Sequence, residues 1–175
     1  MGFFAKFFTT SLVCCILGGC VTDGEDDFYE IRIGETLPAF SIKMSMGETI
    51  NSRDLKNHVS VIVFFNTGCP DCREELSIVQ RVYNYCIEEE IKVRFLCISR
   101  NEGDASVARY WQKHNITLPY SAQTDRTVYS LFASSIIPRI YIVSPSLVIT
   151  HSFTDNPLAS YEALMGAINF PQRRL

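Results

Sequence analysis

Several features that would indicate particular classes of protein are missing from the 175-residue sequence. Its 16 basic residues are scattered instead of gathered in a run, and the formal net charge is -3. The sequence therefore shows no basic run that would bind the phosphates of a nucleic acid. Internal repeats at solenoid periods and low-complexity tracts are also missing. The apolar run near the start is too short to cross a membrane as a permanent helix. We therefore expect proteins or small thiols as partners, and no nucleic acid.

Metal ligands are sparse as well. A zinc site needs about four ligands, whereas Cys69 and Cys72 have no second cysteine pair, and His58, His114 and His151 are far apart in the sequence. The sequence therefore predicts no metal site and no cofactor. The composition, 47% hydrophobic and 20% charged, is typical of a globular chain, and 175 residues leave no room for a second full domain.

The first 19 residues have the pattern of an export signal. Lys6 is followed by an apolar run that ends in the sequence Leu17-Gly18-Gly19-Cys20, which resembles a bacterial lipobox. This pattern predicts a lipoprotein signal peptide over residues 1–19, lipidation of Cys20, and a membrane anchor in the cell envelope. The alternatives are an ordinary secretory signal and an inserted anchor with an incidental cysteine.

Residues 20–34 are predicted to be an acidic tether between this anchor and a domain over residues 35–175. Four acidic side chains lie close together at Asp23, Glu25, Asp26 and Asp27, which suits a solvated spacer. The same cluster resembles a surface-export signal of some bacterial lipoproteins, and both interpretations stay open.

The rest of the chain alternates strand and helix patterns, which indicates an α/β fold. Residues Val59–Phe65 are β-branched, aromatic and nearly all apolar, as expected of a strand buried on both faces. A helix over about Pro70–Glu90 and a strand over Lys92–Ile98 follow, which predicts a βαβ unit with parallel strands. The other expected elements are a hairpin of 40–44 with 48–50, a helical turn at 52–55, helices near 105–114, 126–133 and 159–168, and strands 139–143 and 147–153. Together they predict a mixed central sheet flanked by helices, with an N-terminal hairpin and an inserted helix.

The pair Cys69 and Cys72 lies where the buried strand gives way to a helix. Two cysteines three apart on a first helical turn have their sulfurs within disulfide distance, so the pair can open and close without moving the fold. Unpaired N–H groups and the helix dipole favour a thiolate at Cys69 by about 0.3–1 kcal/mol, and Pro70 is tolerated at the first helical position. This predicts a redox-active Cys69–Cys72 disulfide with Cys69 as the nucleophile and Cys72 as the resolving thiol. A structural disulfide is less favoured, because so short a loop constrains the unfolded chain little.

The sequence resembles the thioredoxin superfamily, in particular the membrane-anchored bacterial thiol-disulfide oxidoreductases related to TlpA and ResA. The resemblance covers about residues 33–170 and is carried by 33–40, by Val61–Glu75 with its Cys-Pro-Asp-Cys motif, and by Ile136-Ile137-Pro138. It implies a thioredoxin-like fold and dithiol-disulfide exchange with exported proteins, with electrons delivered by another membrane protein. It also implies that the peptide bond between Ile137 and Pro138 is cis and lies beside the reactive pair.

Several positions depart from that family pattern. Gly68 replaces a Trp, Asp71 replaces a Pro, and Val63 stands where thioredoxin has a buried Asp. Glu75 occupies a position where related proteins keep a carboxylate, so it is either a proton acceptor or a surface residue of the helix. Arg139 replaces a common Thr after the proline, which predicts a changed substrate preference at the groove.

The predicted function is therefore an exported thiol-disulfide oxidoreductase. Asp71 adds negative charge beside the pair, which disfavours a strongly oxidising disulfide and favours the reductase direction. One alternative is a copper-binding assembly factor of the Sco type, although that group has a Cys-x-x-x-Cys spacing and a ligand histidine. A peroxiredoxin would need Thr where the chain has Asn66. The remaining alternative is a thioredoxin-fold binding module without catalysis.

The other cysteines have structural interpretations. Cys86 and Cys97 fall on apolar faces of a predicted helix and strand, which indicates buried free thiols, with a second disulfide between them left open. Trp111 is spaced with Val107 for a core position on a helix.

The lipobox pattern yields a direct prediction about membrane attachment. Wild-type protein is expected in the membrane fraction of its host, because the acyl groups on Cys20 hold it there. The variant Cys20→Ser should lose this attachment, as measured by fractionation and immunoblotting. Equal membrane association of both proteins, with the signal cleaved in both, would contradict the anchor.

Overall fold

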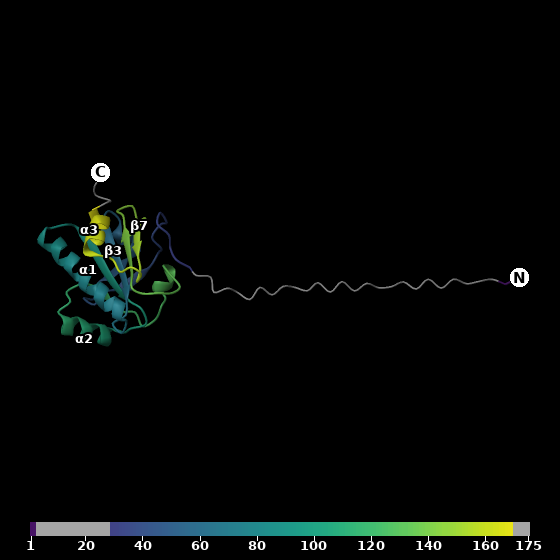
Figure 1. Cartoon of the computed structure of the whole chain (residues 1–175), viewed down its shortest axis with the longest axis horizontal. Helices are drawn as coiled ribbons and strands as arrows, with labels where there is room; N and C mark the ends of the chain where they lie inside the picture. Colours follow the sequence, from purple (N-terminus) through teal and green to yellow (C-terminus); the bar gives the residue numbers. More distant parts are fainter. Residues whose placement is uncertain (3–28, 170–175) are drawn as a thin grey trace.

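The structure is a computed structural model, and it describes residues 1–2 and 29–169 (Figure 1). Residues 3–19 of the predicted signal peptide, Cys20 and the acidic part of the tether lie outside the described residues. Within the described part of the chain, none of the helices combines the length and the apolar character that crossing a membrane requires.

A five-stranded mixed sheet forms the centre of the domain, in the order β5-β4-β3-β6-β7. Its strands are β3 (Val59–Phe65), β4 (Val93–Ser99), β5 (Tyr120–Ser121), β6 (Arg139–Val143) and β7 (Ile149–Phe153). The helices are α1 (Pro70–Glu88), α2 (Asp104–His114) and α3 (Tyr161–Asn169), with the 3-10 turns η1 (Ser52–Leu55) and η2 (Tyr129–Leu131). A separate hairpin consists of β1 (Ser41–Lys43) and β2 (Thr49–Asn51).

Strand β3 is the central strand, as its composition predicts. All seven of its residues are buried. It pairs with β4 in parallel, and α1 connects the two strands, so the predicted βαβ unit is present. On its other side β3 pairs with β6 in antiparallel orientation, and β6 continues into a hairpin with β7. The predicted mixed sheet, N-terminal hairpin and additional helix are confirmed.

The alternating side chains of β3 face two different cores. Val61, Val63 and Phe65 belong to a core that contains side chains of all three helices. Ile62 and Phe64 belong to a second core on the opposite face, which the hairpin and residues 128–133 cover. Because side chains alternate along a strand, one continuous apolar run can supply both cores.

The chain differs from the predicted elements in two places. The expected helix near 126–133 forms only the turn η2, although Val128, Tyr129, Phe132 and Ala133 are buried in the second core and only Leu131 of its apolar residues is exposed. Side-chain hydrogen bonds hold this segment to the loop that follows, from Tyr129 to the carbonyl of Ile136 (2.6 Å) and from Arg126 to that of Ser134. The two-residue strand β5 was not predicted, because two residues are too few to show alternation.

The predicted boundary at residue 35 is too late. Ile31 is 3% exposed, and its N–H donates to the carbonyl of Phe132 (2.7 Å). The N–H of Gly34 donates a hydrogen bond to the carbonyl oxygen of Ile149 (2.8 Å), and the Glu30 carboxylate forms an ion pair with Arg139. Residues 29–34 therefore contact the domain through the buried side chain of Ile31, the ion pair of Glu30 and backbone hydrogen bonds, although most of their side chains are exposed.

Candidate active site

Helix α1 presents the cysteine pair at its first turn. The helix begins at Pro70, and Cys69 is its N-cap residue, with extended backbone geometry. The Cys69 Sγ accepts a hydrogen bond from the N–H of Cys72 (3.3 Å), one of the groups that a helix start leaves without an intrahelical partner. The structure thus brings Cys69, Pro70 and Cys72 together as the sequence pattern predicts, with Pro70 at the position that tolerates the missing N–H.

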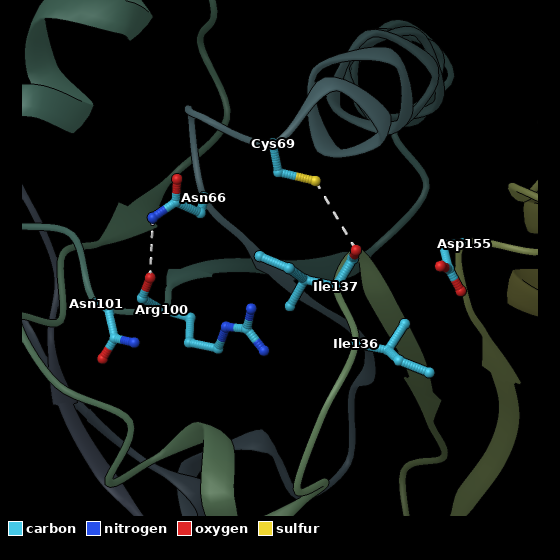
Figure 2. Close-up of a pocket in the computed structure, with 7 residues that line it drawn as sticks. All are labelled: Asn66, Cys69, Arg100, Asn101, Ile136, Ile137 and Asp155. Atoms are coloured by element: carbon cyan, nitrogen blue, oxygen red, sulfur yellow. Dashed lines mark hydrogen bonds between the residues drawn. The ribbon is translucent and has the colours of Figure 1, made fainter.

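The loop before β6 lies against the same sulfur. The Sγ atom of Cys69 points toward the carbonyl oxygen of Ile137, 3.8 Å away (Figure 2). The peptide bond between Ile137 and Pro138 is cis, which agrees with the expectation for this bond. Residues 68 positions apart in the sequence therefore meet at the site.

The two cysteines differ in their surroundings. Cys69 is half-buried, whereas Cys72 is fully buried, and both are free thiols. Burial raises the pKa of Cys72 strongly, and its interaction with the neighbouring Cys69 sulfur adds to the increase. The arrangement therefore holds Cys72 as a neutral thiol while Cys69 lines an open cavity.

That cavity has a volume of about 390 Å³ and is lined by residues from four loops (Figure 2). Its lining residues are Asn66, Cys69, Arg100, Asn101, Ile136, Ile137 and Asp155. The Arg100 guanidinium lies 4.9 Å from the centre of the Tyr129 ring, a cation–π contact. The cavity offers polar side chains and an apolar wall next to the reactive sulfur.

The turn between β3 and α1 is held on both sides. Glu102 accepts hydrogen bonds from the N–H (2.7 Å) and the hydroxyl of Thr67, and Arg73 donates from Nε to the Thr67 carbonyl (2.6 Å). Asn66 donates from its side chain to the carbonyl of Arg100 (3.1 Å). These contacts fix the chain immediately before Cys69.

The sequence patterns did not indicate that Asn66, Arg100, Asn101, Glu102 or Asp155 lies at the site. The sequence could have indicated the first four, because they follow the ends of two strands that were predicted to be parallel. Polar residues at the carboxyl ends of parallel strands converge at one edge of a sheet. Asp155 follows β7 in a loop that no local pattern connects with the site.

Glu75 is buried, so its interpretation as a surface residue is wrong. It lies on α1 one turn after Cys72 and is 1% exposed. Its Oε2 accepts the N–H of Ala159 (3.2 Å), whereas Oε1 has no hydrogen-bond partner among the described residues. Burial raises the pKa of Glu75 from about 4.5 to about 7, and the hydrogen bond from Ala159 only partly opposes this effect.

Arg139 does not face the groove, which corrects the expectation of a role in substrate preference. Its side chain is 1% exposed, forms an ion pair with Glu30, and donates from Nε to the carbonyl of Ser135 (3.2 Å). Consecutive residues of a strand point to opposite faces, and Arg139 aligns with Phe64 and Tyr141 on the face of the second core.

The remaining residues of interest lie elsewhere. Asp71 is exposed on the first turn of α1. Cys86 and Cys97 are buried free thiols, and burial raises the pKa of each. Trp111 packs in the core with Phe65. Across residues 29–169, no three His, Cys, Asp or Glu side chains gather into a group that could hold a metal ion.

The buried carboxyl group of Glu75 predicts a specific dependence of stability on pH. Between about pH 4.5 and 7 the folded protein holds a proton that the unfolded chain has released, so stability falls as the pH rises through this window, by roughly 3 kcal/mol. Chemical denaturation at pH 5 and pH 8 should show this loss in the wild type and in the control Glu88→Gln, an exposed carboxylate at the other end of α1. Glu75→Gln should not show it, and an equal loss in all three proteins would contradict the raised pKa.

Comparison with known proteins assigns the chain to a family. Residues 33–152 match the AhpC/TSA family. Thiol-disulfide oxidoreductase ResA of Bacillus subtilis is 22% identical over 162 residues, which cover 88% of each chain. Among solved structures, a thiol:disulfide interchange protein of the thioredoxin family from Chlorobium tepidum has a TM-score of 0.65 at 20% identity and covers 82% of this chain and 99% of its own. StoA from Bacillus subtilis has a TM-score of 0.62 at 18% identity, covering 74% of this chain and 96% of its own.

The structural likeness and the family match agree with the geometry described above. The sheet order, the cysteine pair at the start of α1 and the cis bond before β6 occur within or beside the matched residues. The chain belongs to the AhpC/TSA family, and its fold is thioredoxin-like.

Proposed function

We propose that the protein is a thiol-disulfide oxidoreductase that exchanges the Cys69–Cys72 dithiol with disulfides of exported proteins. The observation that carries the proposal is the difference between the two thiols, a half-buried Cys69 at a helix N-terminus and a fully buried Cys72 one turn inside. A purely structural pair does not need this difference. The similarity to proteins named thiol-disulfide oxidoreductase ResA supports the same activity.

In the first step the Cys69 thiolate attacks one sulfur of a substrate disulfide. A mixed disulfide forms between Cys69 and the substrate, and the second substrate sulfur leaves as a thiolate. The N–H of Cys72 already points at the Cys69 sulfur, and the helix dipole favours negative charge there. The cavity next to Ile137 gives the substrate room to approach this sulfur.

In the second step Cys72 releases the substrate. The Cys72 thiol gives up its proton and attacks the Cys69 sulfur, so that the Cys69–Cys72 disulfide forms and the substrate leaves with two electrons. Glu75 is the proton acceptor in this proposal, since it lies one helical turn away with a pKa of about 7. A base with that pKa is ionised in part at neutral pH and can still be reprotonated.

The proposed direction is reduction of the substrate. Exposed Asp71 adds negative charge next to Cys69, which disfavours a strongly oxidising disulfide. Each cycle leaves the pair oxidised, so a membrane protein with a reducing dithiol must return two electrons. Attachment of the protein to the membrane through Cys20, outside the cytoplasm, would keep it close to such a donor.

The asymmetry of the pair predicts different failures for the two cysteine variants. Cys69→Ser should abolish reduction of a disulfide substrate, because the attacking thiol is gone. Cys72→Ser should still attack once and then stall as a mixed disulfide, which mass spectrometry of the trapped complex detects. Alkylation of the reduced wild type should modify Cys69 first. Equal, slow labelling of both thiols without any reductase activity would instead indicate a structural pair and a binding function.

The proposed role of Glu75 predicts a defect in the second step alone. Glu75→Gln should slow release of the substrate from the mixed disulfide by about 100-fold at pH 8, since the proton acceptor is lost. Stopped-flow measurement should also show that the inflection near pH 7 in the wild-type release rate disappears. The control Glu88→Gln changes charge at the other end of the same helix and should keep both properties. Loss of rate with an unchanged pH profile in Glu75→Gln would indicate a merely structural role.

A further inference from the structure

A second hollow adjoins the active-site cavity on the side of α2. It has a volume of about 430 Å³ and shares the lining residues Asn66 and Asn101 with the cavity of Figure 2, so the two hollows lie side by side. Its wall next to the reactive cysteine is formed by Gly68. A group in this hollow would lie directly beside a substrate bound at Cys69.

The charged side chains around the hollow are mainly basic. Arg73 of α1 and Arg109 and Lys113 of α2 line it and are exposed, against one carboxylate, Glu102, whose oxygens accept hydrogen bonds from Thr67. Among residues 29–169, no carboxylate lies within ion-pair distance of any of these three cations. The hollow is therefore a local concentration of positive charge on a chain whose net charge is -3.

The fold accounts for only part of the positive charge on α2, because Lys113 lies in the last turn, where the helix dipole favours a cation, whereas Arg109 does not. Arg109 and Lys113 are four residues apart on the helix, and like charges at this spacing repel each other. Neither side chain forms a hydrogen bond with another residue in the part of the chain that the structure describes, whereas Arg73 holds the Thr67 carbonyl. Two exposed cations that repel each other and support no neighbour beside a reactive cysteine point to a ligand with negative charge.

We propose that this basic hollow, defined by Arg73, Arg109 and Lys113, binds an acidic segment of the substrate protein next to the disulfide that Cys69 attacks. The inference rests on the proposed function and adds the class of substrate. An extended chain advances about 3.3 Å per residue, so acidic side chains a few residues from the reacting cysteine would reach these cations. Complementary charge raises the rate of encounter and selects among substrates.

The shape of the hollow favours a protein segment over a small acidic thiol. It is an open hollow of about 430 Å³, and its cations come from two helices, Arg73 from α1 and Arg109 and Lys113 from α2. Its position beside the cavity at Cys69 lets an extended chain lie across both hollows.

The test compares two peptides that contain the same internal disulfide, one flanked by three acidic residues and the other by the matching amides. The variant Arg109→Gln/Lys113→Gln should lower kcat/KM for the acidic peptide about tenfold at low salt, and high salt should remove the difference. The neutral peptide should be reduced at the wild-type rate. The control Arg53→Gln/Lys56→Gln removes the same charge from the exposed residues of η1 and its end, and should change neither rate. A loss that is equal for both peptides, or no loss, would overturn the inference.

Two further measurements separate the possible failures. Oxidised glutathione should be reduced at the same rate by wild type and variant, and a loss equal to that of the acidic peptide would overturn the assignment to a protein segment. A version of the acidic peptide with serine in place of cysteine should bind the wild type more tightly than the variant in fluorescence anisotropy. Such binding without reduction of any disulfide would contradict the proposed function and support the basic hollow. Reduction of both peptides without a charge preference would support the proposed function and overturn the assignment of the basic hollow.

Discussion

The site depends on one constraint, the pairing of β3 with a parallel strand on one side and an antiparallel strand on the other. Because β6 runs against β3, the beginning of β6 lies beside the end of β3, where Phe64 is paired with Arg139. The residue after the β3 turn, Cys69, and the loop before β6, with Ile137, must therefore meet at the same edge of the sheet. Burial of β3 on both faces holds this arrangement rigidly.

Burial also sets the chemistry of the groups behind Cys69. The first core encloses Cys72 and Glu75 on the inner side of α1, and removal from water disfavours the charged form of both. The same burial that stabilises the fold through the apolar residues of α1 thus keeps the Cys72 thiol protonated near neutral pH and raises the pKa of the Glu75 carboxyl group to about 7. Only Cys69, at the very start of the helix, remains open to a partner.

Charged residues are divided between the two faces of the sheet. Arg139 forms an ion pair with Glu30 and is therefore not available to a substrate. This ion pair joins the segment that begins at residue 29 to β6 on the face of the second core. A buried cation that lost this partner would be strongly destabilising. Near Cys69, Arg100 lines the cavity from the loop after β4, and the exposed cations of the neighbouring hollow lie on α1 and α2.

Local patterns in the sequence determined the elements with a strong signal. The apolar run of β3, the helical spacing of α1 and the cysteine pair with Pro70 between them are short-range features, and their positions follow from backbone and helix-capping physics alone. Resemblance to a family added the cis bond at Pro138, which no local pattern indicates. Only the tertiary structure decided that Glu75 is buried, that Arg139 turns away from the groove, and that residues 29–34 belong to the domain. Each of these depends on which face of an element meets another segment far away in the chain, and the spacing of residues within one segment carries no information about that partner.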